Sequence, residues 1–320
     1  MPGSVIVGGA RTPIGKLSGA LKGFTAMDLG GFAIKAALER SGISGDQVDY
    51  VIMGHVIQAG AGQITARQAA VKGGIPMNVP ALTVNKVCLS GLNAIAMADQ
   101  LIGAGEFDVV VAGGMESMTN GPCLLPGARG GYRYGDNKIV DATSHDALYC
   151  AFDLRGMGDS TEFYSKQRQL TREDQDAYSA QSHERAVTAR KNGLFDDEIV
   201  TVTVPQRRGD PITVTAGSAS QISDGAAAVV VTSRAKAEEL GAPVLAEIGA
   251  HGVVAGPDAS LLSQPSNAIL KALGKAGKTP QDVDLFEINE AFAAVALQSM
   301  RDLEITDENV NVNGGAISTG

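Results

Sequence analysis

Val84-Asn85-Lys86-Val87-Cys88-Leu89-Ser90-Gly91 is the stretch of this chain from which the fold can be worked out. The apolar residues 81–84 before it predict a strand, residues 92–104 after it predict a helix, and residues 107–112 predict a second strand. This order forms a βαβ unit, which implies a parallel sheet. We expect the helix to be buried on most sides because it has few polar residues, namely Asn93, Asp99 and Gln100.

Cys88 lies in the turn that opens this helix. Unpaired N–H groups and the positive end of the helix dipole at such a place favour a thiolate over a thiol. A thiolate there can attack a thioester or another acyl carbonyl. The alternative is a small buried cysteine packed at the end of a strand, which is the commoner fate of an unpaired cysteine.

The composition narrows the class of protein. The chain has 320 residues, 44% of them hydrophobic, which is enough for two units that each bury a core. A net charge of -9, without a cluster of Lys or Arg, argues against a nucleic-acid partner. No apolar run approaches the roughly 18 residues of a membrane span, and we expect no membrane partner. The first residues also lack the features of a signal peptide.

The three cysteines, Cys88, Cys123 and Cys150, are spaced like neither a metal site nor a disulfide framework. A reducing, cytoplasmic location fits them best. The four histidines have no metal partner at ligand spacing, so we predict no metal site and interpret all four as structural or solvent-exposed: His55, His145, His183 and His251.

An internal repeat indicates a duplicated α/β half. Residues 33–53 match residues 268–288 without a gap, pairing Ala37-Leu38 with Ala272-Leu273, Gly42 with Gly277, and Val48-Asp49 with Val283-Asp284. Between the two copies the sequence loses its periodicity. We therefore predict three parts: an N-terminal half over 1–117, a loop domain over 118–222 that covers the substrate and makes oligomer contacts, and a C-terminal half over 223–320.

The second copy stops at Gly320, where the first copy continues into a helix and a strand. A chain seldom ends on a Gly-rich turn behind a buried strand, so we expect the sequence to be incomplete at its C-terminus.

With these features laid out, the chain resembles the thiolase family, of the acetyl-CoA C-acetyltransferase kind, over essentially its whole length. The motifs that carry the resemblance occur in family order: Arg11-Thr12-Pro13-Ile14-Gly15, Gln58-Ala59-Gly60, Cys88-Leu89-Ser90-Gly91, Gly113-Gly114-Met115-Glu116-Ser117-Met118, Asp224-Gly225-Ala226-Ala227, Asn289-Glu290-Ala291-Phe292-Ala293 and Asn313-Gly314-Gly315-Ala316. The resemblance implies an α/β fold in which duplicated βαβ-rich halves form a layered α/β/α/β/α core, with the loop domain inserted after the first half.

The resemblance also implies an activity and a site. The reaction is the reversible Claisen condensation of two acetyl-CoA to acetoacetyl-CoA and CoA, or thiolysis of a 3-ketoacyl-CoA. Cys88 resembles the nucleophile that forms an acyl-cysteine, and Asn289 resembles the residue that stabilises the enolate oxygen through a water. Positions that line the pantetheine channel are Leu148, Met157, Ser220, Ala291 and Phe292. No cofactor is bound permanently, coenzyme A thioesters are the substrates, and a homodimer or homotetramer is expected.

Some features depart from the family pattern. The family's His-Pro pair and a further cysteine that exchanges the α-proton would follow Gly320, and Val214-Thr215 is a direct join where the family has a segment that contacts the adenine end of CoA. Gly156 and Leu261 stand where the family usually has other residues of the acyl pocket. The length of acyl chain that this protein prefers therefore does not follow from the resemblance.

Three alternatives remain beside the leading hypothesis. One is a degradative thiolase for longer or bulkier chains. A condensing enzyme of the ketoacyl synthase type shares a cysteine at a helix start, but the Asn289-Glu290-Ala291-Phe292 stretch argues against it. The third is a non-catalytic protein with the same fold.

Overall fold

A computed structural model of the chain describes residues 3–205, 212–214 and 222–320. These residues form two compact units, each described by itself. Unit 1 contains residues 3–148, 198–205, 212–214 and 222–248, and unit 2 contains Tyr149–Asp197 and Gly249–Gly320.

Unit 1 is built on a mixed sheet with the strand order β13-β1-β12-β5-β3-β4, and β2 pairs with β12. The sequence predicts a parallel sheet, and β3 is indeed parallel to β4 and to β5. The sheet is mixed because β12, for which the sequence gives no direction, runs antiparallel to both β5 and β1 and lies between them. The strands are β1 (Val5–Arg11), β2 (Gly15–Lys16), β3 (Tyr50–Gly54), β4 (Ala81–Val84), β5 (Val109–Ser117), β12 (Ser223–Thr232) and β13 (Ala246–Glu247).

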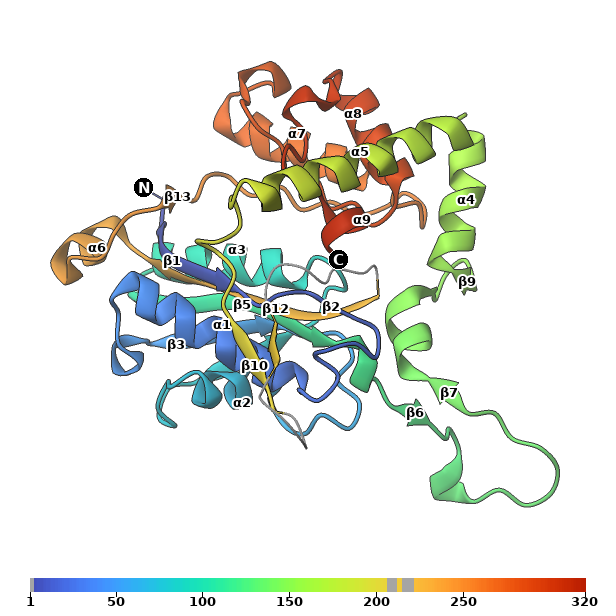
Figure 1. The fold of residues 1–320 in the computed structure, drawn as a ribbon, viewed down its shortest axis with the longest axis horizontal. Coiled ribbons are helices and arrows are strands. Elements are labelled where there is room, and N and C mark those ends of the chain that lie inside the picture. The colour runs from blue at the N-terminus through green and yellow to red at the C-terminus, as the bar shows by residue number, and fades with distance from the viewer. Residues whose placement is uncertain (1–2, 206–211, 215–221) are drawn as a thin grey trace. The chain divides into compact units, whose positions relative to one another are not determined.

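Helices cover both faces of this sheet (Figure 1). Val109 and Val111 of β5 pack in the core on the side of α1 and α2, whereas Val110 and Ala112 pack in the core on the side of α3. This alternation follows from the two-residue period of a strand. The predicted α/β class is therefore confirmed. The helices of unit 1 are α1 (Ala26–Ser41), α2 (Thr65–Lys72), α3 (Ser90–Gly103) and α6 (Arg234–Leu240).

Helix α1 has clear end signals. Thr25 and Asp28 form a capping box at its start, and Gly42 ends it with φ of +71°, a conformation that glycine adopts without strain. The matching helix of the repeat, α7 (Gln264–Ala276), also ends at a glycine in this conformation, Gly277. A one-turn helix with a capping box follows each glycine at the same distance, so the structure confirms the repeat over these elements.

Helix α3 is buried along only one face. The prediction that it is buried on most sides is therefore wrong. Its buried residues recur every four positions: Ser90, Ala94, Ala98 and Ile102. The start of the helix approaches the sheet closely because Gly54 of β3 has no side chain. A Cβ at Gly54 would lie 2.6 Å from the Cβ of Ser90.

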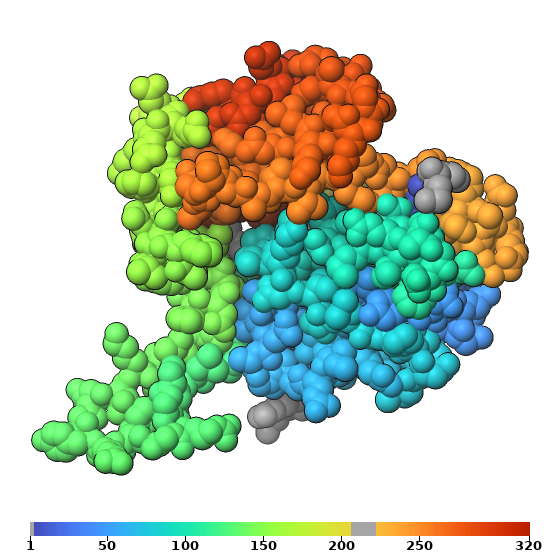
Figure 2. Space-filling model, turned by 180° about the vertical axis from the view of Figure 1, so that it is seen from behind, coloured from blue at the N-terminus to red at the C-terminus, as the bar shows by residue number. Residues whose placement is uncertain are grey.

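A long arm over residues 123–141, which belongs to unit 1, follows β5 in the chain. It is closed at its base by the short strands β6 (Cys123–Leu124) and β7 (Val140–Asp141), which pair antiparallel. Figure 2 shows this stretch in green, extending away from the blue and teal body of the unit. The strands β10 (Val202–Val204) and β11 (Ile212–Val214) pair in a separate two-stranded sheet.

Unit 2 is mainly helical, with two apolar cores. One core gathers around Phe286, Ile288 and α8, and the other around Leu170, Leu262 and Val295. Besides α7, its elements are α4 (Met157–Gln167), α5 (Arg172–Lys191), α8 (Ala293–Leu303), α9 (Ala316–Thr319), β8 (Tyr149–Cys150) and β9 (Arg155–Gly156).

Residues 283–288 and 310–313 are joined by a single bridge, between Phe286 and Val310, and form no longer ladder. The reason is Asn311, which has φ of +47° and so turns the backbone out of a strand. Its side-chain amide takes the place of the ladder, because Oδ1 accepts from the N–H of Ile288 and Nδ2 donates to the carbonyl of Ile288, both at 2.8 Å.

Candidate functional site

Cys88 lies in a tight turn between β4 and α3, as the sequence predicts. Val87, just before it, has φ of +50°, which is a strained conformation for a β-branched residue. Side chains hold the turn. Asn85 Oδ1 accepts from the N–H of Val87 at 3.0 Å, and the hydroxyl of Ser90 accepts from Lys86 N–H at 2.8 Å and donates to the Val87 carbonyl at 2.6 Å.

The expected stabilisation of a Cys88 thiolate is not found. The N–H groups of Leu89 and Ser90 bond to the carbonyls of Lys86 and Val87, so these two donors at the helix start do not face the sulfur. Burial of the sulfur by the protein around it raises the pKa of the Cys88 thiol, and a backbone hydrogen bond offsets this in part. The residue is nevertheless exposed to solvent. Accessibility decides whether a reagent can reach Cys88, whereas the pKa decides how much thiolate is present when it does.

Asn289 belongs to unit 2, where alternate residues point outward and inward. Asn289 is exposed, while its neighbours Ile288 and Glu290 are 4% and 3% exposed. The Asn289 side chain is therefore presented outward on a stretch that is anchored on both sides.

Glu290 provides the stronger anchor. Its Oε1 accepts from the Tyr178 hydroxyl and from Asn311 Nδ2, both at 2.9 Å, and its Oε2 accepts from the Ser182 hydroxyl at 2.8 Å and from Ile317 N–H at 3.0 Å. Four donors make the burial of a carboxylate tolerable. Burial, together with the charge of Glu290, raises the pKa of Tyr178, which therefore stays a donor. Neither Glu290 nor Tyr178 stands among the catalytic residues expected from sequence.

The residues expected along the pantetheine channel divide between the units. In unit 2, Met157 begins α4 and is half-buried, and Phe292 is half-buried against the core around Leu262. A Cβ at Gly158 would lie 4.0 Å from a ring carbon of Phe292, so the start of α4 adjoins that ring. Ala291 is exposed.

Leu148 and Cys88 belong to unit 1, and Leu148 is half-buried at the end of the short helical segment η4 (Thr143–Leu148). Ser220 and Thr215 lie outside the described residues.

Two general properties concern the whole described chain. Within residues 3–205, 212–214 and 222–320, no group of three or more His, Cys, Asp or Glu side chains is placed to hold a metal ion. In the same part of the chain, no helix is both long and apolar enough to cross a membrane.

Comparison with known proteins places these features in context. The family model for the thiolase N-terminal domain matches residues 4–213, and that for the thiolase C-terminal domain matches residues 242–320. A probable acetyl-CoA acetyltransferase of Mycolicibacterium smegmatis is 55% identical, over 99% of this chain and 89% of the relative. Another of Mycobacterium tuberculosis is 55% identical over 100% and 88%, and the acetyl-CoA acetyltransferase of Cupriavidus necator is 46% identical over 99% and 88%.

Proposed function

Because this chain belongs to the thiolase family and is an acyltransferase, we propose that it joins two acetyl-CoA into acetoacetyl-CoA and CoA, and catalyses the reverse thiolysis. The observation that carries the proposal is the placement of Cys88: an exposed residue on a strained turn between the edge strand β4 and helix α3. Strained backbone of this kind concentrates at functional sites.

The reaction proceeds in two steps. The sulfur of Cys88 attacks the carbonyl carbon of the first acetyl-CoA, a carbon–sulfur bond forms, and CoA leaves as a thiolate that takes up a proton. A base then removes an α-proton from the second acetyl-CoA, and the resulting carbon nucleophile attacks the acyl-cysteine, which releases acetoacetyl-CoA and the thiol. Since the pKa of Cys88 is raised, the first step needs a proton acceptor close to the sulfur.

Other residues take supporting roles in this proposal. Asn289 stabilises the enolate oxygen of the second acetyl-CoA through a water. Pantetheine is a slim amide arm that suits apolar walls with a few polar contacts, which Leu148, Met157, Ala291, Phe292 and Ser220 are proposed to supply.

The enzyme is proposed to work as a homo-oligomer. β4 ends the strand order of its sheet, and exposed apolar side chains surround it and the turn after it: Ile64, Met77, Leu82, Val87 and Leu89. An edge strand and an apolar surface of this kind suit a second copy of the chain. The arm carries the exposed Tyr132 and Tyr134 beside Arg133, and offers a second contact. Light scattering at micromolar concentration tests this, and a monomer mass contradicts it.

The function is tested by mass spectrometry of the intact protein after mixing with acetyl-CoA, together with a thiolysis assay that uses acetoacetyl-CoA and CoA. The wild type should gain one acetyl group on Cys88 and turn over. Cys88→Ala should do neither, while the matched variant Cys123→Ser should do both. Turnover by Cys88→Ala, or acetylation of Cys123 or Cys150 instead, overturns the proposal.

A further inference from the structure

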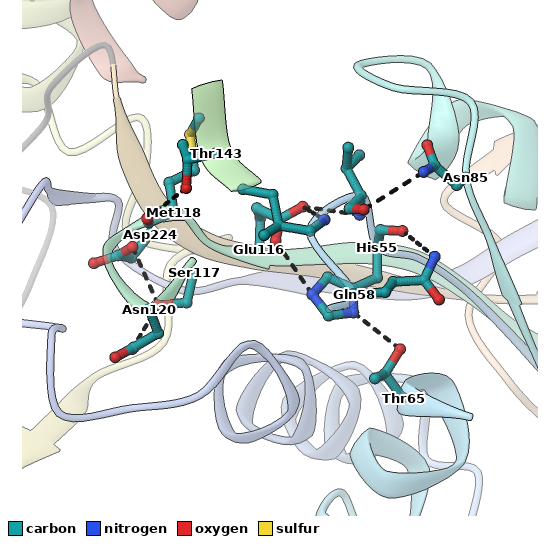
Figure 3. A network of polar contacts seen from close by, with 12 residues as sticks. His55, Gln58, Thr65, Asn85, Glu116, Ser117, Met118, Asn120, Thr143 and Asp224 are labelled. Atoms are coloured by element: carbon teal, nitrogen blue, oxygen red, sulfur yellow. Dashed lines mark hydrogen bonds and ion pairs between the residues drawn. The ribbon is translucent and has the colours of Figure 1, made fainter. Parts of the chain in front are cut away.

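A buried histidine lies behind the Cys88 turn. His55 follows β3 and is 2% exposed, and its two ring nitrogens contact Glu116 Oε1 at 3.2 Å and the Thr65 hydroxyl at 3.0 Å. Figure 3 shows the ring held between these two side chains. All of these residues belong to unit 1. The reaction proposed above does not use His55 or Glu116.

A line of polar contacts passes through the His55 ring. His55 Nε2 lies 3.2 Å from Glu116 Oε1, and Nδ1 lies 3.0 Å from the hydroxyl of Thr65. The hydroxyls of Thr65 and Thr83 are 3.2 Å apart, and the Thr83 hydroxyl accepts from the N–H of Ala66 at 2.9 Å. These contacts link β4 to β5 through the His55 ring.

The same pair also fixes the backbone that supports the Cys88 turn. Glu116 Oε2 accepts from the N–H of Val56 at 2.9 Å, and the carbonyl of Val56 accepts from Asn85 Nδ2 at 3.5 Å. Asn85 Oδ1 accepts a hydrogen bond from the N–H of Val87, the residue with the strained backbone conformation. His55 itself donates its backbone N–H to the last carbonyl of β4, that of Val84, at 3.0 Å. The pair thus reaches the turn both through the end of β4 and through Asn85.

We propose that His55 and Glu116 are positioning residues for Cys88: together they hold Asn85 and the end of β4, and so keep the thiol on its strained turn. The buried imidazole of His55 and the half-buried carboxylate of Glu116 contribute little net stability compared with apolar side chains of similar size, whereas their polar contacts fix one arrangement of the backbone around them. This inference rests on the proposed role of Cys88 as nucleophile.

The test compares four variants. His55→Leu removes both ring contacts, whereas His55→Gln places an amide near Nε2 and keeps a donor to Glu116. Glu116→Gln removes the negative charge beside Nε2 and turns an amide NH₂ toward the ring, since the N–H groups of Val56 and Ile57 keep the amide oxygen on their side. Ile34→Val, at a core position of α1, is the matched control because it destabilises unit 1 modestly and removes no polar contact.

Two readouts separate positioning from general stability. Because misplacing a reactive group by about 1 Å costs up to roughly a hundredfold in rate, His55→Leu should lower kcat by about tenfold to a hundredfold with KM nearly unchanged. Its rate of Cys88 alkylation by iodoacetamide, relative to Cys123 in the same molecule, should change as well. Glu116→Gln should also lower kcat and change the rate of Cys88 alkylation. His55→Gln should retain most of the wild-type kcat.

Normal kcat and normal Cys88 alkylation in both His55→Leu and Glu116→Gln overturn the inference, as does a loss no larger than that of Ile34→Val. Should His55→Leu fail to fold, Glu116→Gln carries the test. If the wild type proves inactive in acyl transfer, the alkylation ratio still decides whether the pair positions Cys88, so the two proposals fail separately.

Discussion

The carboxylate of Glu290 accepts a hydrogen bond of 2.9 Å from the hydroxyl of Tyr178, which lies on α5. This contact ties the stretch that presents Asn289 to a long helix of the same unit. Gly315 lets the carboxylate approach, since a Cβ there would lie 2.3 Å from Cδ of Glu290. The exposed Asn289 therefore owes its position to a buried neighbour that is bonded to protein donors.

Glu290→Gln should destabilise unit 2. Each carboxylate oxygen meets one donor that cannot become an acceptor, Asn311 Nδ2 on one side and Ile317 N–H on the other. Whichever way the new amide turns, its NH₂ faces one of them, and the loss should be about 1–3 kcal/mol. Urea unfolding measures it, with the exposed Glu308→Gln as control. Equal stability of Glu290→Gln and the wild type would contradict this account.

Tyr178→Phe should weaken the protein in a way that depends on pH. The folded protein raises the pKa of Tyr178 through burial and the Glu290 charge, so its contribution is fully present below the unfolded value of about 10 and is lost as pH rises above that. At pH 8 the variant should lose about 1–2 kcal/mol through the missing hydroxyl. The gap to the wild type should narrow above pH 10. Unfolding curves at both pH values, with the fully exposed Tyr134→Phe alongside, check this, and a constant gap argues against it.

Local signals in the sequence were sufficient where a few neighbouring residues decide the structure. Thr25, Asp28 and Gly42 set the ends of α1, and the turn that carries Cys88 lies between a strand and a helix as predicted. The direction of β12 could not be predicted, because it depends on which distant strands it pairs with.

In the candidate site, too, contacts between residues distant in the sequence could not be predicted. His55 and Glu116 lie far apart in the sequence, and neither has neighbours that indicate a contact between them. The sequence favoured a thiolate at Cys88, whereas burial of the sulfur by the surrounding protein raises the pKa of the Cys88 thiol, and that burial cannot be read from a residue pattern. The role of Asn311 could not be predicted, because its side chain bonds to the backbone of Ile288, a residue distant in the sequence.

Asp28→Asn should make the start of α1 less stable above pH 4. Burial raises the pKa of Asp28, but hydrogen bonds from Lys72 and Thr25 outweigh it, so the pKa lies below its usual 3.8. A lowered pKa means that the stabilisation is present above 3.8 and is lost as pH falls through the folded value. The variant should lose about 1 kcal/mol at pH 7, and little near pH 2. Urea unfolding at both pH values measures the difference, and an equal loss at pH 2 would rule out the carboxylate as its source.

Ser90→Ala and Val87→Gly should interact, since Ser90 holds the conformation that strains Val87. Ser90→Ala leaves the Lys86 N–H without its side-chain partner and removes one of the two hydrogen bonds to the Val87 carbonyl, and should cost about 1–3 kcal/mol. Val87→Gly removes strain of roughly 1 kcal/mol or more, but the glycine loses about 0.5–1 kcal/mol through its freedom when unfolded. Its net effect on stability should be small.

In the Val87→Gly background, glycine adopts the positive φ of the turn without strain. Ser90→Ala should therefore lower the free energy of unfolding by less in that background than it does alone. A double-mutant cycle by urea unfolding measures this coupling, which should exceed the roughly 0.5 kcal/mol seen for independent sites. The thiolysis assay provides a second measurement. Ser90→Ala removes the side chain that holds the turn, whereas Val87→Gly keeps it, so kcat should fall more in Ser90→Ala than in Val87→Gly. Additive stabilities and equal kcat values would show that the positive φ of Val87 is not maintained by Ser90.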